Sequence, residues 1–185
     1  METPWIDTGY TTLALEGPKQ LRVERLAKKV GKSKSSFYHH FADMEVFISF
    51  LLANHLDRIK MIADKEAACD TIDELFDVII EHKVDLLFNR QLRFHRDDKD
   101  FVKCYEKANE LALDSILDVW AKFLDLTDQT YLARMVLVLV LENFFLQISA
   151  KDLNKEWLQS YFNQIRSMIA AFKNDPALLK LDGTV

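Results

Sequence analysis

The chain has 185 residues, of which 49% are hydrophobic and 29% are charged, and its formal net charge is −5. This composition excludes an intrinsically disordered chain, and the length allows one compact body or two small ones. The longest uninterrupted apolar run, residues 135–141, is far shorter than the roughly 20 residues of a membrane-spanning helix. Because the N-terminus also lacks a basic start followed by an apolar stretch, we expect a cytoplasmic protein with no membrane partner.

Glycine and proline occur only before residue 32 and after residue 175. Strands joined by tight hairpins normally need glycine-containing turns, whereas helices tolerate short connections built from Asp, Asn, Ser and Thr. The chain is therefore predicted to be all-α.

Three short helices are expected before residue 44. The first covers about residues 5–15. The second buries a stripe of small and branched residues and ends at Gly31, which can adopt a positive φ. Ser33 can cap the third, Lys34 to His40. The second and third helices form a helix-turn-helix. The buried stripe of the second helix consists of Val23, Leu26, Ala27 and Val30, and Phe37 and Phe41 anchor the third helix.

Positive charge is concentrated in the same segment. Residues 18–41 carry seven lysines and arginines against one glutamate, in a protein that is acidic as a whole. A local positive field attracts phosphates whatever the global charge. The third helix leaves hydroxyl, ammonium and imidazole groups free to reach phosphates or base edges of DNA, on Ser33, Lys34, Ser35, Ser36, Tyr38 and His39.

A helix of about 20 residues follows, with Asp43 as its expected N-cap and an apolar face from Met44 to Ile62. The segment from Gly17 to Leu52, GPKQLRVERLAKKVGKSKSSFYHHFADMEVFISFLL, resembles the DNA-binding domain of TetR-family transcriptional regulators. The family pattern runs from a glycine through a short helix, a G-x-S-K turn and Y-x-H/Y-F into a long connecting helix. The six residues named above match the recognition-helix positions of that family.

The resemblance implies a three-helix DNA-binding domain in residues 1–43 and a helical ligand-binding and dimerisation domain in residues 44–185. It further implies a homodimer whose last two helices form a four-helix bundle. Each subunit would hold a small-molecule effector and release near-palindromic operator DNA, as a repressor does, when that pocket fills. The long helix from Met44 would transmit the change between the domains.

Three places depart from the family pattern. Met44 stands where the family usually has a phosphate-contacting lysine, Leu21-Arg22 replaces the usual threonine, and the first helix is acidic. We expect Lys19, Arg22 and Lys32 to supply some of the missing phosphate attraction. The departures leave an alternative open, an all-α dimeric ligand-binding or interaction protein whose helix-turn-helix no longer reads DNA specifically.

Further helices follow in chain order. Thr71 and Glu74 form the pattern of a capping box, and one helix is expected from there to Leu87. Residues 93–100 have no apolar stripe and are expected to connect two helices. The pattern resumes over residues 101–124 as one helix or two.

The segment 131–148 is apolar on all sides and is therefore expected to be buried on every side. A chain of this size rarely surrounds a helix fully, so one side is expected to meet a second subunit. A last amphipathic helix ends between Asn174 and Pro176, and residues 131–173 are the expected dimer seam. The alternative is that both helices belong to one large core within a monomer.

Within the apolar segment, Glu142 either has a partner within the protein, across the dimer or against the core, which we favour, or faces a pocket that takes a cationic ligand. Aromatic residues could line that pocket, although such stripes are more often plain core. The candidate ligand-binding residues are Phe88, Phe101, Tyr105, Trp120, Phe123, Glu142 and Phe145.

Enzymatic activity, a metal and a cofactor are not expected. The chain contains no H-x-x-x-H, no H-E-x-x-H, no phosphate-binding glycine loop and no G-x-S-x-G. Cys69 and Cys104 lie far apart, so neither a disulfide framework nor a zinc site is indicated.

Overall fold

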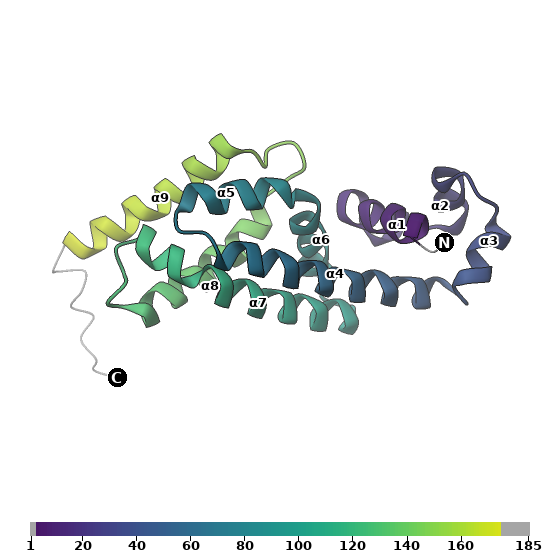
Figure 1. Cartoon of the computed structure of the whole chain (residues 1–185), viewed down its shortest axis with the longest axis horizontal. Coiled ribbons are helices and arrows are strands. Elements are labelled where there is room, and N and C mark those ends of the chain that lie inside the picture. The colour runs from purple at the N-terminus through teal and green to yellow at the C-terminus, as the bar shows by residue number, and fades with distance from the viewer. Residues whose placement is uncertain (1–2, 175–185) are drawn as a thin grey trace.

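The computed structural model describes residues 3–174, and every regular element in that range is a helix, which confirms the all-α prediction. Three helices and a short 3₁₀ turn form an N-terminal head, a long helix leads out of it, and the remaining helices form a body (Figure 1). In chain order the elements are α1 (Thr3–Glu16), η1 (Pro18–Gln20), α2 (Val23–Val30), α3 (Lys34–His40), α4 (Met44–Ala67), α5 (Ile72–Glu81), α6 (Lys83–Phe94), α7 (Lys99–Phe123), α8 (Thr130–Gln147) and α9 (Lys155–Asn174).

The head is built around aromatic side chains. Phe37 and Phe41 of the segment around α3 are fully buried, and the Phe37 ring meets the Trp5 ring of α1 edge to face at 5.4 Å. Gly31 ends α2 with φ 71°, a left-handed conformation that side chains with a Cβ rarely adopt. The Ser33 hydroxyl then accepts a hydrogen bond from the backbone N–H of Ser36 and caps α3. The predicted helix-turn-helix is confirmed in its bounds and in its caps.

Helix α4 connects the head to the body and lies beside α7 along much of its length (Figure 1). It begins as predicted, because the Asp43 carboxylate accepts a hydrogen bond from the Val46 N–H. In the body, the buried Trp120 indole N–H of α7 donates to the carbonyl of Ala133 in α8 at 3.0 Å. That bond satisfies a polar group inside an otherwise apolar core.

Three expected boundaries in the body need correction or refinement. The capping box at Thr71 is present, but the helix expected to reach Leu87 breaks at His82 into α5 and α6. The two halves have different packing partners, since α5 contacts α9 whereas α6 contacts α1. The connection expected over 93–100 is shorter, because α6 extends to Phe94 and α7 starts at Lys99. Residues 101–124 belong to one helix, α7, with Leu124 as its cap.

Helix α8 is buried on one side in the single chain and exposed on another, which agrees with the expectation that this chain alone does not surround it. One face, including Leu137 and Phe144, packs into the core, while other large apolar side chains are exposed. Within residues 3–174, α8 is also the one helix that is long and apolar enough to cross a membrane by length and composition. The exposed set on α8 is Tyr131, Leu132, Met135, Val138, Leu139 and Leu146.

Candidate DNA-binding and ligand-binding sites

The candidate DNA-binding side chains lie on the surface of the head. Eight of the nine are exposed and Ser36 is half-buried. Tyr38 is 56% exposed, and its ring packs edge to face on the buried Phe37 ring. This contact restrains the Tyr38 ring. Lys19 lies in η1, Arg22 immediately precedes α2, and the others follow between Lys32 and His39. The nine residues therefore all lie in the helix-turn-helix or in the short segment from η1 to Arg22 that precedes it.

The structure divides the basic residues of the head into two groups. Arg25 and Lys29 of α2 both pair with Glu16 of α1, which joins these two helices, and Lys34 pairs with Glu24. Lys19, Arg22, Lys28 and Lys32 make no ion pair with any residue of the range 3–174. Free ammonium and guanidinium groups can neutralise phosphates without first losing a partner. Lys28 was not among the predicted residues, although it is exposed like Lys19, Arg22 and Lys32.

Met44, the departure at the start of α4, has a structural explanation. Its side chain is half-buried and packs against the hydrophobic core. Asp43 supplies the N-cap of the same helix, so this helix start is stabilised by a cap and an apolar contact. Met44 cannot replace the charge of a phosphate-contacting lysine.

A buried polar cluster joins the head to the body. The Tyr10 hydroxyl of α1 donates to Asp85 Oδ1 of α6 at 2.6 Å and lies 2.7 Å from His55 Nδ1 of α4. Arg58 of α4 binds the same carboxylate through both Nε, at 2.5 Å, and an Nη atom, at 3.0 Å. The four residues, called here the junction cluster, therefore tie three helices together at one carboxylate.

The protonation states of the junction cluster follow from burial and pairing. Burial alone raises the pKa of Asp85, but hydrogen bonds from Arg58 and Tyr10 outweigh it and hold that pKa below its ordinary value. Burial lowers the pKa of His55 to about 4, so its ring is neutral at pH 7. The neutral His55 ring has one N–H for two contacts, the Tyr10 hydroxyl oxygen 2.7 Å from Nδ1 and Asn89 Oδ1 3.4 Å from Nε2.

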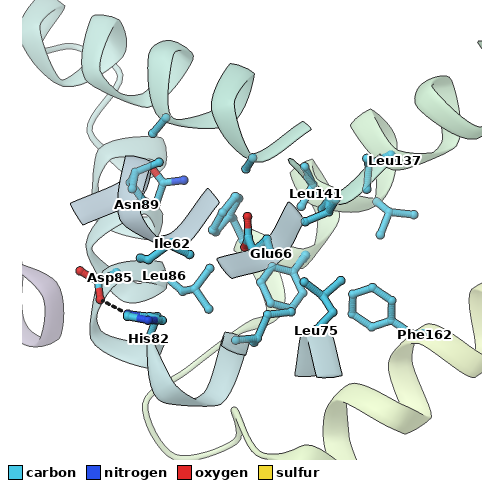
Figure 2. Close-up of a pocket in the computed structure, with 18 residues that line it drawn as sticks. Ile62, Glu66, Leu75, His82, Asp85, Leu86, Asn89, Leu137, Leu141 and Phe162 are labelled. Atoms are coloured by element: carbon cyan, nitrogen blue, oxygen red, sulfur yellow. Dashed lines mark hydrogen bonds and ion pairs between the residues drawn. The ribbon is translucent and has the colours of Figure 1, made fainter. Parts of the chain in front are cut away.

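A narrow apolar cavity of about 50 Å³ lies in the body between α4, α5, α6, α7, α8 and α9 (Figure 2). That volume holds no more than a few water molecules, well below the roughly 300 to 1,000 Å³ of ligand sites. Most of its wall is aliphatic or aromatic. The polar side chains in the wall are Glu66, His82, Asp85 and Asn89, and the last three stand on or beside α6.

The predicted ligand-binding residues do not gather at this cavity. Of the seven, Phe145 lines it. Tyr105 and Glu142 line a separate, open depression together with Arg96 and Arg134. The remaining three aromatic residues of the core, Phe88, Phe101 and Trp120, are fully buried elsewhere, and Phe123 is half-buried beneath Arg166.

Glu142 is paired inside the protein, as the argument from its sequence favoured. Its carboxylate accepts hydrogen bonds from Arg93 at 2.7 Å, Tyr105 at 3.0 Å and Arg96 at 3.2 Å. The side chain is 37% exposed, so it is not the buried carboxylate that its apolar neighbours suggested. The group joins α6, α7 and α8.

Sequence reasoning missed both Glu66 and the junction cluster. Glu66 lies four residues after Ile62, the last residue of the predicted apolar face of α4, so it continues that face. His55 lies within the same predicted face, between Met44 and Ile62. Asp85 directly precedes the apolar pair Leu86-Leu87. A polar residue inside an apolar helical stripe was the available signal in each case.

Among residues 3–174, no group of three or more His, Cys, Asp or Glu side chains is arranged to hold a metal ion. Cys69 and Cys104 are both free thiols, the second of them buried. Burial raises the pKa of Cys104 to about 12, which leaves its thiol protonated.

Comparison with known proteins identifies the N-terminal part. Residues 6–49 match the family described as bacterial regulatory proteins, tetR family, which confirms the resemblance drawn from residues 17–52. The chain is also similar to a crystal structure from Mesorhizobium loti MAFF303099 that is assigned to the TetR family of transcriptional regulators. The two share 19% identity over 92% of this chain and 95% of the other, with a TM-score of 0.58, which shows a common fold. No curated protein matches the chain.

Proposed function

The chain carries the DNA-binding domain of tetR-family regulatory proteins on a helical body with the fold of a regulator of that family, and we propose that it is a ligand-responsive repressor. Residues 1–43 are the DNA-binding domain and residues 44–185 the ligand-binding and dimerisation domain. A homodimer binds a near-palindromic operator and leaves it when an effector fills the body. The protein acts in the cytoplasm and catalyses no reaction.

The exposed helix-turn-helix surface carries this proposal. Tyr38 and His39 of α3 are exposed on a helix held from behind by Phe37 and Phe41. Cations that make no ion pair within residues 3–174 stand at Lys32, two residues before this helix, at Lys19 in η1 and at Arg22 directly before α2. Sequence-specific DNA-binding domains combine the same two features: cations contact phosphates and fix the position of the protein on the duplex, and a short helix presents side chains to base edges.

The exposed apolar face of α8 supports the homodimer. Between α8 and α9 runs a groove whose wall is largely apolar, with Leu139 of α8 and Met168 of α9 among its exposed residues. A two-fold axis beside this groove would cover the face with its own copy. The opposite face of α8, with Leu137 and Phe144, belongs to the core of the body, so we propose that the exposed face meets protein and not lipid.

The junction cluster supports a route from effector to DNA. Asp85 belongs both to the cavity wall and to the hydrogen bond with Tyr10 of the head. Because the cavity is narrow, an effector has to displace its walls, including α6. Movement of α6 and α4 would carry the head with it and change the separation of the two recognition helices, which would have to span successive major grooves about 34 to 36 Å apart. A coupling of roughly 1 to 3 kcal/mol changes operator affinity five- to 150-fold.

Fluorescence anisotropy of the protein on DNA from upstream of its own gene tests the proposal, across a salt series and against random-sequence competitor. Lys32→Ala removes one phosphate contact from each protomer, so the salt slope of a dimer falls by about 2. Lys19→Ala and Arg22→Ala are expected to act alike. Lys122→Ala, an exposed lysine of α7 in the body, is the matched control and leaves the slope unchanged.

Binding that survives competitor, with a slope reduced in the three head variants alone, supports a sequence-specific regulator. Equal loss to any DNA, or a slope that no head variant alters, would instead favour a helical dimer whose helix-turn-helix has ceased to read sequence. A genome-wide selection of binding sites then separates that result from the use of a wrong operator.

A further inference from the structure

The cavity in the body contains a carboxyl group, that of Glu66, which has no cationic partner among residues 3–174. Glu66 is 8% exposed and stands near the middle of the ring of apolar side chains in Figure 2. One of its oxygens, Oε2, lies 2.6 Å from the Ser115 hydroxyl. The other accepts no hydrogen bond from any residue in the described range 3–174. A carboxyl group set in an apolar wall without a cation beside it favours a ligand that brings a positively charged donor.

The hydrogen bonding around Ser115 fits a carboxyl group that is neutral when the cavity is closed. The Ser115 hydroxyl has one proton and two acceptors within reach, Glu66 Oε2 and the carbonyl of Ala112 at 3.0 Å. Both contacts are satisfied if Glu66 is protonated and donates to Ser115, which then donates to Ala112. Burial raises the pKa of Glu66 to about 7, in agreement with this arrangement.

The rest of the wall favours a positive ligand over a negative one. No lysine or arginine of the described residues lines the cavity, so nothing there would balance an anion. The other ionisable groups in the wall are His82 and Asp85, which lie together at one end (Figure 2). Asp85 is already bound by Arg58 and Tyr10. Glu66 is therefore the carboxylate left for a ligand, and aromatic walls that include Phe144, Phe145 and Phe162 suit an apolar or cationic group.

We propose that the effector of this protein is a lipophilic amine, whose ammonium group pairs with the Glu66 carboxylate while its apolar part occupies the space between α5, α7 and α8. The inference rests on the proposed function and names the chemical class of the effector. When an ammonium ion binds, Glu66 gives its proton to solvent, so that ammonium and carboxylate face each other. Entry requires the walls to separate, since the closed cavity is smaller than any such molecule.

Isothermal titration calorimetry with three probes of equal skeleton tests the proposal. The probes are 4-phenylbutylamine, 4-phenylbutan-1-ol and 4-phenylbutanoate. The amine is expected to bind the wild-type protein at least about tenfold more tightly than the acid, since ionic hydrogen bonds contribute about that much or more. Titrations at pH 7 in buffers of different ionisation enthalpy are expected to show release of about half a proton per amine, because a group with a pKa near 7 is half protonated there.

Two isosteric variants locate the partner of the amine. Glu66→Gln is expected to weaken the amine at least about tenfold, to abolish proton release, and to leave the alcohol within about threefold. Glu142→Gln changes the carboxylate already bound by Arg93 and Arg96, and it is expected to change neither amine affinity nor proton release. Circular dichroism checks that both variants fold.

The proposal is wrong if the amine fails to bind at millimolar concentration, if amine and acid bind equally, or if Glu142→Gln removes amine binding and Glu66→Gln does not. Operator binding is measured on the same samples without any probe. Specific DNA binding combined with no amine preference would overturn the effector class alone. Glu66-dependent amine binding by a protein that reads no DNA would overturn the proposed function alone.

Discussion

At the scale of single residues, Asp85 has an exceptional position because one carboxylate serves three helices. Its side chain is 2% exposed, and it accepts hydrogen bonds from Tyr10 and Arg58. Removing a charge from such a buried group leaves its partners uncompensated, which costs more than an isolated surface pair contributes. Helix–helix contact at this point therefore depends on the charge of a single side chain.

We expect Asp85→Asn to lower the free energy of unfolding by about 2 to 3 kcal/mol, because the amide cannot hold the Arg58 guanidinium and the Tyr10 hydroxyl as the carboxylate does. Asp57→Asn, in an exposed pair with Lys60, is the matched control and is expected to change stability by less than about 0.5 kcal/mol. Urea unfolding followed by circular dichroism measures both. Equal stability of the two variants would show that the junction cluster contributes nothing to the fold.

His55 and Glu66 are buried in the same protein and affect its stability in opposite directions as pH changes. The pKa of His55 is lowered from 6.5 to about 4, so the folded state resists protonation and His55 removes stability as pH falls from about 6.5 to 4. The pKa of Glu66 is raised from 4.5 to about 7, so the unfolded state ionises first and Glu66 removes stability as pH rises from about 4.5 to 7.

The contribution of each group is obtained by subtracting the unfolding free energy of the wild type from that of the variant. Between pH 4.5 and 6.5, this difference is expected to rise by about 2 kcal/mol for Glu66→Gln, since one pKa unit corresponds to 1.36 kcal/mol. The value for His55→Phe relative to wild type is expected to fall by a similar amount over the same range. Chemical denaturation at several pH values measures both, and two flat difference profiles would contradict the assignment.

At the scale of helices, local signals in the sequence mark the end of α2 and the starts of α3, α4 and α5. The Asp43 cap, the box formed by Thr71 and Glu74, and the left-handed Gly31 are all present as predicted. Each of these features depends on hydrogen bonds between residues a few positions apart, so residue types at fixed spacing in the sequence predict it. The break at His82 has no such signal, since neither glycine nor proline marks it, and it separates two helices that pack against different neighbours.

For helix α8, the local sequence likewise does not predict which side chains are buried in the single chain. Its composition predicts burial all round, whereas Leu139 is 69% exposed and Met135 is 47% exposed in the single chain. Composition reports how much apolar surface has to be covered but not whether the same chain or another copy covers it. The open groove beside α9 makes a second copy the proposed cover.

Leu139→Glu is expected to leave the fold of the single chain within about 0.5 kcal/mol of the wild type, because the side chain is already exposed. In a two-fold dimer the change puts two carboxylates into one apolar seam, so the dissociation constant is expected to rise at least about a hundredfold. Sedimentation velocity over a concentration series measures it. Met61→Glu, at a 60% exposed methionine of α4, is the control, and a dimer that tolerates Leu139→Glu equally well would place the interface elsewhere.

At the scale of the whole molecule, the arrangement of head and body along α4 makes DNA reading a property of a pair of heads. A dimer held through the bodies presents its recognition helices at one separation, which has to match the pitch of the duplex. Inserting five base pairs between the operator half-sites turns one half-site by about half a helical turn. We expect the affinity measured by anisotropy to fall at least about a hundredfold, toward the level of non-specific DNA.

Replacing five central base pairs without changing the length is the control for this experiment, and it is expected to retain most of the affinity. If the insertion is tolerated as well as the replacement, the two heads read DNA independently, and a fixed separation of recognition helices plays no part in binding.

The all-α class could be predicted because glycine and proline are absent from residues 32–175, and the helix-turn-helix because its caps and apolar spacing lie within about forty neighbouring residues. Which distant side chains meet depends on the tertiary packing. Tyr10, His55 and Asp85 belong to three helices, and Glu66 and Ser115 to two, so no local pattern relates them. Helical periodicity specifies the face on which a residue lies, but the packing of one helix against another decides what that face touches.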